Sequence, residues 1–264
     1  MRNIRLNIAY DGTNYKGWQI QAKGAGASYP QKTIQHEIET ALSGIFTARV
    51  KVIGSGRTDA GVHALGQVAN FKLNNSMPCN RILRALNSVL PRDIVITSVT
   101  DVKESFHSRF DAISKLYRYR IFNCPCAPLF DRLYQYHIPY KINHDLMISA
   151  SRVLIGRHDF RSFQASGGKK IDPVREIISL SISRRGNVIS MYIEADGFLY
   201  NMVRNIVGTL VEIGRGKIQP EHIRDILKAR DRREAGPTAP AKGLCLMRVK
   251  YPKTAARDNR SIKQ

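Results

Sequence analysis

The sequence lacks an uninterrupted apolar run of the roughly 18 residues that would predict a membrane-spanning helix. Its first residues enter an alternating polar and apolar pattern at once, without the apolar run of a signal peptide. We therefore expect no membrane partner and a cytoplasmic protein, or one whose targeting segment lies outside this sequence.

Acidic residues are scarce. Asp and Glu total 21 against 42 Lys and Arg, which leaves a formal net charge of +21. An excess of this size predicts a polyanionic partner, and charge alone leaves RNA, DNA, the ribosome and an anionic membrane surface open. The basic residues are spread along the chain, whereas a disordered basic tail would have concentrated them.

Cysteine is rare and histidine is scattered, which argues against a metal centre. The four cysteines are Cys79, Cys124, Cys126 and Cys245, and the Cys-Pro-Cys spacing of the middle pair fits neither a zinc knuckle nor a redox motif. None of the seven histidines falls into a His-Glu-x-x-His pattern. We expect free thiols and no metal site.

The spacing of apolar residues predicts the order β-α-β-β-α-β twice. In the first half the predicted elements are residues 2–10, 31–46, 49–53, 67–73, 78–90 and 94–102. In the second half they are residues 115–123, 143–155, 174–183, 187–194, 198–213 and 244–251, with one extra helix at 219–230.

This repetition predicts an α+β fold with two ferredoxin-like halves related by a pseudo-twofold, and a basic active-site cleft between them. We place the halves at residues 1–105 and 106–252, followed by a polar tail at 253–264. Sheets of this kind often bind RNA across one face, but a fold alone does not establish a function.

The most informative stretch is Gly54–Gln67, which reads GSGRTDAGVHALGQ and is predicted to lie between two strands of the first half. Three of its glycines fall within eight residues, so the backbone can turn tightly and approach a ligand closely. It is not a phosphate-binding P-loop, because no Gly-Lys-Ser/Thr follows. An isolated Gly-x-Gly is more often part of a glycine loop with a solvated Asp, and for Asp59 that alternative stays open at this point.

This stretch resembles the catalytic motif of the TruA family of tRNA pseudouridine synthases. Other stretches resemble further motifs of that family, in the same order and over nearly the whole chain: 10–19, 106–110, 115–120, 201–208 and 239–244. The resemblance implies an isomerase that acts on tRNA as a homodimer. It also implies that the target uridines, at about positions 38 to 40 of the anticodon stem-loop, are flipped out of the stack.

The resemblance also implies roles for individual residues. Asp59 matches the catalytic nucleophile, and Tyr117 matches the residue that packs on the target base. Arg57 matches a residue implicated in base flipping, Arg204 a cation that pairs with the catalytic carboxylate, and Leu244 an apolar residue that lines the pocket. The segment that matches the family's tRNA-contact segment consists of Phe106, His107, Ser108, Arg109 and Phe110.

The implied chemistry needs no cofactor. Uridine loses its N1–C1′ bond, turns, and rejoins the sugar through C5, without redox change or group donor. One carboxylate can open that bond by covalent attack or by removing a sugar proton, and both routes stay open.

Structural roles compete with several of these assignments. Tyr117, Tyr119 and Ile121 share one strand face, and an aromatic stripe at this spacing is more often part of a core. Arg204 could be a solvated side chain, although its apolar neighbours favour partial burial, and a buried Arg needs an anion. The segment Gln21–Gln31 is longer than is common in the family.

Two other function classes compete with an isomerase. A non-catalytic RNA-binding module could have the same fold, but the presence of Asp59 argues against it. A metal-dependent nuclease would need clustered carboxylates, and Asp59 has no acidic neighbour within its motif.

Overall fold

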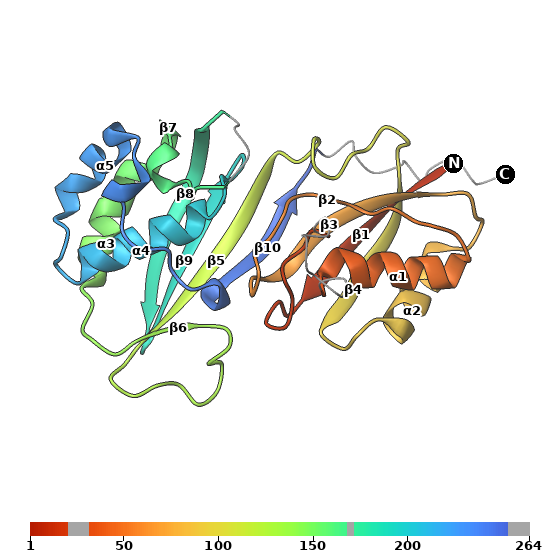
Figure 1. The fold of residues 1–264 in the computed structure, drawn as a ribbon, viewed down its shortest axis with the longest axis horizontal. Coiled ribbons are helices and arrows are strands. Elements are labelled where there is room, and N and C mark those ends of the chain that lie inside the picture. Colours follow the sequence, from red (N-terminus) through yellow and green to blue (C-terminus); the bar gives the residue numbers. More distant parts are fainter. Residues whose placement is uncertain (21–31, 168–171, 253–264) are drawn as a thin grey trace. The chain divides into compact units, whose positions relative to one another are not determined.

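The computed structural model describes residues 1–20, 32–167 and 172–252. Its contacts divide the chain into two compact units (Figure 1): unit 1 is Met1–Ile113 with the described residues from Leu246 onward, and unit 2 is Ser114–Cys245. Both units combine β-strands and helices. The segment 21–31 and the tail 253–264, both singled out in the sequence, lie outside the described residues. Within the described residues, no helix is long and apolar enough to cross a membrane.

The described residues of unit 1 form two helices and five strands, one of which, β10, crosses the boundary between the units. They are β1 Arg2–Tyr10, α1 Ile34–Phe46, β2 Ile53–Gly54, β3 His63–Leu73, α2 Cys79–Val89, β4 Ile94–Val102 and β10 Leu244–Lys250. The strands lie in the order β4-β1-β3-β10, and β2 also pairs with β3. β1 is antiparallel to β3 and β4, and β2 is antiparallel to β3.

The core of unit 1 follows from the two periodicities seen in the sequence. Alternate residues of β1 point inward, and the helices α1 and α2, which contact each other, bury residues spaced by about one turn. Thr33 begins α1 by accepting a hydrogen bond from the backbone N of His36 at 3.3 Å. The fully buried side chains include Ile4, Leu6, Ile8, Ile34, Ile38, Leu42, Ile82 and Leu86.

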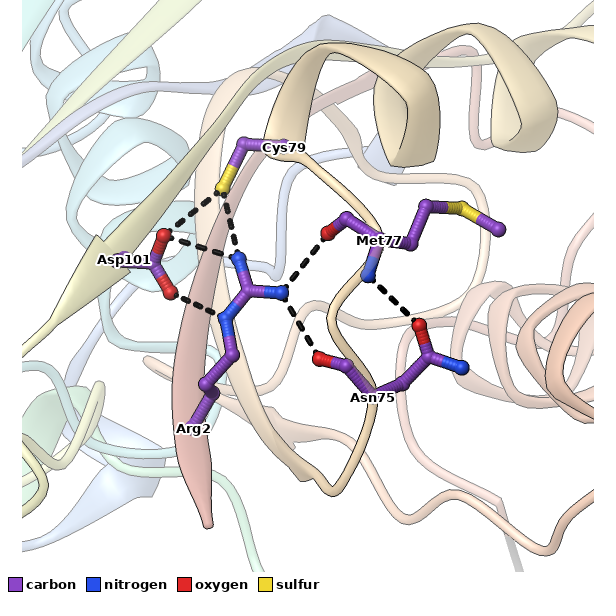
Figure 2. A network of polar contacts seen from close by, with 5 residues as sticks. All are labelled: Arg2, Asn75, Met77, Cys79 and Asp101. Carbon is purple, nitrogen blue, oxygen red and sulfur yellow. Dashed lines mark hydrogen bonds and ion pairs between the residues drawn. The ribbon is translucent and has the colours of Figure 1, made fainter.

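A polar network at the start of β1 ties three segments of unit 1 together (Figure 2). The Arg2 guanidinium donates to both carboxylate oxygens of Asp101 at 2.9 and 3.0 Å. It also donates to the carbonyls of Asn75 and Met77 at 2.9 and 2.8 Å, and contacts the Cys79 Sγ at 3.6 Å. Arg2 therefore joins β1, β4 and the segment that leads into α2.

Besides the start of β10, the part of unit 2 that the structure describes forms five strands and three α-helices. They are β5 Ser114–Asn123, β6 Tyr136–Ile138, α3 His144–Ser151, β7 Gly156–Asp159, β8 Val174–Arg185, β9 Val188–Ala195, α4 Met202–Gly214 and α5 Ile223–Ala229. The order β5-β9-β8-β7 is antiparallel throughout, and β6 pairs with β5 in parallel. The helix α3 packs against β8 and α4.

The main differences from the predicted elements have physical causes. The strand expected at 49–53 is reduced to Ile53–Gly54, because the backbone of Val52 bonds to side chains of α1 instead of a strand: its N donates to Glu39 at 2.9 Å and its O accepts from Gln35 at 3.1 Å. The helix expected at 219–230 begins as a 3-10 turn at Pro220–His222 before α5. The short strands β6 and β7 were not predicted.

We expect Arg2→Lys to lower the free energy of unfolding by about 1–3 kcal/mol, because a lysine ammonium cannot bond to the carboxylate and the two carbonyls in this geometry. Urea unfolding followed by circular dichroism measures the change. Arg81→Lys on the exposed side of α2 is the matched control and should change stability by less than about 0.5 kcal/mol. Equal midpoints for the two variants would show that the network in Figure 2 adds no stability.

Candidate active site

The loop that carries Asp59 is fixed at its start by buried polar side chains. The backbone N of Ser55 donates to the carbonyl of Val68 at 2.7 Å, and its hydroxyl donates to the Gln67 Oε1 at 2.7 Å. The Gln67 amide in turn donates to the carbonyl of Gly56 at 3.1 Å. Ser55 and Gln67 are both fully buried, so the loop leaves β2 along a defined path.

The N-terminal segment holds the middle of the same loop. The backbone N of Trp18 donates to the carbonyl of Thr58 at 3.0 Å, and the N of Gly61 donates to the carbonyl of Tyr15 at 3.3 Å. The Tyr10 hydroxyl and the Thr58 Oγ1 are 2.8 Å apart. The predicted motif at residues 10–19 is therefore, within unit 1, a support for the Asp59 loop.

Two glycines of that segment allow the backbones to touch. A Cβ on Gly12 would overlap the carbonyl of Val62. Gly17 has a φ of +89°, and a Cβ there would overlap the carbonyl of Thr58 and lie 3.0 Å from the carbonyl carbon of Asp59. Only glycine fits such positions without moving a neighbouring backbone. We call these contacts between residues 12–18 and 54–62 the backbone clamp.

The two candidate residues of the loop are less buried than the threonine between them. Thr58 is buried, whereas Arg57 is exposed and Asp59 is half-buried. Thr58 is therefore the residue of the three that the Tyr10 hydroxyl anchors. A carboxylate and a guanidinium are thus presented from one rigid loop, an arrangement that can act on a bound anion or nucleotide.

In unit 2, Tyr117 belongs to the buried aromatic stripe that the sequence indicated. Tyr117, Tyr119 and Ile121 all point to the buried side of β5. The Tyr117 ring meets Phe198 edge to face, with centroids 5.1 Å apart and an interplanar angle of 89°. The Tyr119 hydroxyl donates to the carbonyl of Pro240 at 2.7 Å, and burial raises the pKa of Tyr119 well above its usual value.

Arg204 lies in the first turn of α4, half-buried, with its guanidinium oriented by two neighbours. Its Nε donates to the carbonyl of Ala239 at 2.7 Å, and its Nη1 donates to the Asn201 Oδ1 at 3.0 Å. The backbone N of Ala239 also donates to the carbonyl of Arg204 at 3.1 Å. Arg204 is therefore not a freely solvated side chain. Leu244, at the start of β10, is buried.

Asn205 organises the same region, and the sequence analysis missed it. This fully buried side chain donates to the carbonyl of Phe163 at 2.8 Å. Its Oδ1 accepts from the Thr238 hydroxyl at 2.6 Å and from Arg232 at 3.1 Å. The available signal was a lone amide within the apolar stretch of α4, because a buried amide must find partners.

The expected tRNA-contact segment divides into anchors and outward side chains. Phe106 and Ser108 are buried; the Ser108 N donates to the Asn70 Oδ1 at 2.9 Å, and its hydroxyl donates to the carbonyl of Ile53 at 2.5 Å. His107 is half-buried and stacks on the exposed Phe110, with ring centroids 4.2 Å apart. Arg109 is exposed as well.

The candidate residues are distributed over both units. Arg57, Asp59 and the segment 106–110 lie in unit 1, and Tyr117, Arg204 and Leu244 lie in unit 2. In the described part of the chain, no group of three His, Cys, Asp or Glu side chains is placed to hold a metal ion.

Comparison with known proteins gives matches over most of the chain. A family model described as tRNA pseudouridine synthase matches residues 7–111 and 150–252. The chain is 45% identical to tRNA pseudouridine synthase A 2 of Clostridium perfringens over 251 residues, which is 95% of this chain and 100% of that protein. It is 46% identical to tRNA pseudouridine synthase A of Thermoanaerobacter sp., and 45% identical to that of Brevibacillus brevis, with the same coverage.

A solved structure gives a weaker likeness. A chain in the crystal structure of a Cbf5-Nop10-Gar1 complex has a TM-score of 0.40 and 11% identity, over 92% of this chain and 57% of that one. A likeness of this size bears on neither substrate nor mechanism.

We expect Gly17→Ala to destabilise the protein by at least about 2 kcal/mol, because the new Cβ adds left-handed strain and displaces the Thr58 carbonyl. Gly44→Ala is the matched control. Gly44 lies inside α1 with open space around it, so an alanine there should stabilise by about 0.5–1 kcal/mol. Urea unfolding measures both, and a Gly17→Ala variant as stable as the unmodified protein would disprove the backbone clamp.

Proposed function

Because the chain belongs to the tRNA pseudouridine synthase family and isomerises uridine to pseudouridine in tRNA, we propose that Asp59 is the nucleophile of the reaction. The observation that supports this assignment most directly is the backbone clamp. It fixes the Asp59 loop on both sides of the carboxylate, while Arg57 is exposed and Asp59 is half-buried. A nucleophile acts best when the fold already holds it in place.

The reaction requires one carboxylate and no net redox change. The N1–C1′ bond of uridine breaks, the uracil turns, and a C5–C1′ bond forms; C5 then loses its proton and N1 gains one. The Asp59 carboxylate can add covalently and leave again, or it can accept and return a sugar proton. Both routes return Asp59 unchanged, so atoms and electrons balance without a cofactor.

The residues of unit 2 receive supporting roles in this proposal. Tyr117, whose ring is held by Phe198, packs on the extruded base, and Leu244 adds an apolar wall. Arg204, whose guanidinium is oriented by Ala239 and Asn201, pairs with the catalytic carboxylate and keeps it ionised.

The substrate we propose is a uridine at about positions 38 to 40 of the anticodon stem-loop, extruded from its stack before reaction. The half-buried His107 and the exposed Arg109 and Phe110 contact the tRNA, while Phe106 and Ser108 hold the turn. We further propose a cytoplasmic homodimer. Exposed apolar side chains in unit 2, among them Leu129 and Phe130, are available for contact with a second copy.

We infer that both halves have a ferredoxin-like fold. In unit 1 the element order β-α-β-β-α-β and the antiparallel strand order β4-β1-β3-β2 support it. In unit 2, α3 precedes the antiparallel strands β8 and β9, and α4 follows them. Three features stay predictions: the boundary between the halves at residues 105 and 106, the pseudo-twofold that relates the halves, and the active-site cleft.

We predict that Asp59→Asn folds and binds tRNA but forms no detectable pseudouridine, because an amide can neither attack nor accept a proton as a carboxylate does. Chemical mapping of pseudouridine in tRNA incubated with the variant measures the loss. Asp145→Asn, an exposed carboxylate in the first turn of α3, should retain full activity. If Asp59→Asn stayed within about tenfold of the unmodified rate, a barrier change of only ~1.4 kcal/mol, the assignment would be wrong.

Arg57 should matter most where flipping is hardest. Extruding a base costs a few kcal/mol in a paired stem and less at an unpaired position. We therefore predict that Arg57→Ala slows modification of a stem-paired uridine more than that of an unpaired one. Single-turnover rates on two anticodon-arm RNAs that differ only in this pairing give the comparison, and an equal slowdown would assign Arg57 to chemistry or general binding instead.

A further inference from the structure

Unit 1 contains a second feature that suits RNA, apart from the Asp59 loop. It is a groove of about 540 Å³ beside the turn at 106–110. We call it the basic groove, and its lining residues are Arg49, Lys51, Ile53, Asn70, Phe71, Lys72, Glu104, Ser105, Phe106 and His107.

The segment before β2 directs two cations toward this groove. Val50 and Val52 are buried, so Arg49, Lys51 and Ile53 alternate with them and point to the exposed side. The Val52 backbone is fixed to α1 by its bonds to Gln35 and Glu39. The two cations therefore extend from a fixed backbone rather than from a loose loop.

The remaining lining adds a third cation and a firm floor. Lys72 is exposed at the end of β3, next to the buried Phe71. Asn70 is buried and joined to the turn by its bond to the Ser108 N. Glu104 is the one carboxylate among the lining residues. Lys and Arg side chains that gather without acidic partners create a local positive potential.

The positive charges of Arg49, Lys51 and Lys72 are not paired with carboxylates of the described residues. In the described ranges 1–20, 32–167 and 172–252, no carboxylate lies within ion-pair distance of Arg49, Lys51 or Lys72. By contrast, Arg2 is matched by Asp101 in the same unit. Charges left unmatched on a rigid concave surface are typical of a site that receives an anion.

We propose that the basic groove binds the phosphodiester backbone of the tRNA substrate, outside the target nucleotide, through Arg49, Lys51 and Lys72. The inference rests on the proposed function for the identity of the RNA. The groove is connected to the Asp59 loop along the chain. Its lining residue Ile53 begins β2, and the loop of Arg57 and Asp59 follows β2 directly. Phosphates held here would fix the register of the RNA without reading its sequence.

The test replaces all three cations with alanine and measures tRNA affinity at several salt concentrations. Because each neutralised phosphate releases counterions, we expect the dissociation constant to rise about tenfold or more near 0.1 M salt, and the slope of log Kd against log salt to fall by roughly 2 to 3. Turnover at saturating tRNA should stay within about twofold, since none of these residues touches the reacting base.

A control variant removes the same charge from another surface of unit 1. Arg81, Arg84 and Arg92 are exposed on α2 and the turn after it, and their triple alanine variant should lose little affinity. A benzophenone side chain in place of Lys51 gives an independent readout, and it should crosslink to bound tRNA on irradiation.

The outcomes separate the groove from the reaction. If the unmodified protein forms pseudouridine but the groove variant binds tRNA as tightly as the control and position 51 does not crosslink, the inference is wrong and the proposed function stands. If the unmodified protein forms no pseudouridine, the proposed function fails. Affinity and crosslinking, which need no catalysis, still decide whether the groove holds RNA.

Discussion

The position of the Asp59 loop depends on how closely two stretches of backbone approach each other in unit 1. Gly12 and Gly17 lie so near the carbonyls of Val62 and Thr58 that no side chain fits between them. Hydrogen bonds from Trp18 and to Tyr15 close the contact. Because β1 ends where this segment begins, the sheet itself sets the place of Asp59. The loop is thus ordered by folding, and RNA binding does not have to order it.

Unit 2 uses the same physical device for its own candidate residues. A Cβ on Gly208 would overlap the carbonyl of Pro237, so the segment before β10 lies directly on α4. Asn205 and Thr209 then satisfy the polar groups that this contact buries: Asn205 accepts from Thr238, and the Thr209 hydroxyl accepts from the Gly236 N at 2.9 Å. Arg204 takes its orientation from this same contact through Ala239. Such buried networks are stable only when every member is satisfied, which explains why glycine and small polar residues recur together here.

The sequence correctly predicted the elements in which buried residues recur periodically. The prediction failed where contacts between distant segments determine the structure. β1 and β4 agree residue for residue with the prediction. β3 begins earlier than expected, at His63, because the pairing of Tyr10 with Ala64 extends the ladder into the glycine-rich motif. The candidate site follows the same rule. Arg57 and Asp59 were found from a local motif, whereas Asn205 was not, because its partners lie far away in the sequence.

Rigid and adaptable parts of the molecule suit different steps of one reaction. In the reaction that we propose for Asp59, bond breaking at a single sugar carbon needs a carboxylate fixed to within a fraction of an ångström, and the backbone contacts and buried hydrogen bonds of its loop favour such a fixed position. Holding a long polyanion needs no such precision, because charge acts over several ångströms and long Lys and Arg side chains adjust to each phosphate. The chain separates these demands. The clamped loop carries few charges. Most of the chain's net charge of +21 lies elsewhere, including the unmatched cations of the basic groove.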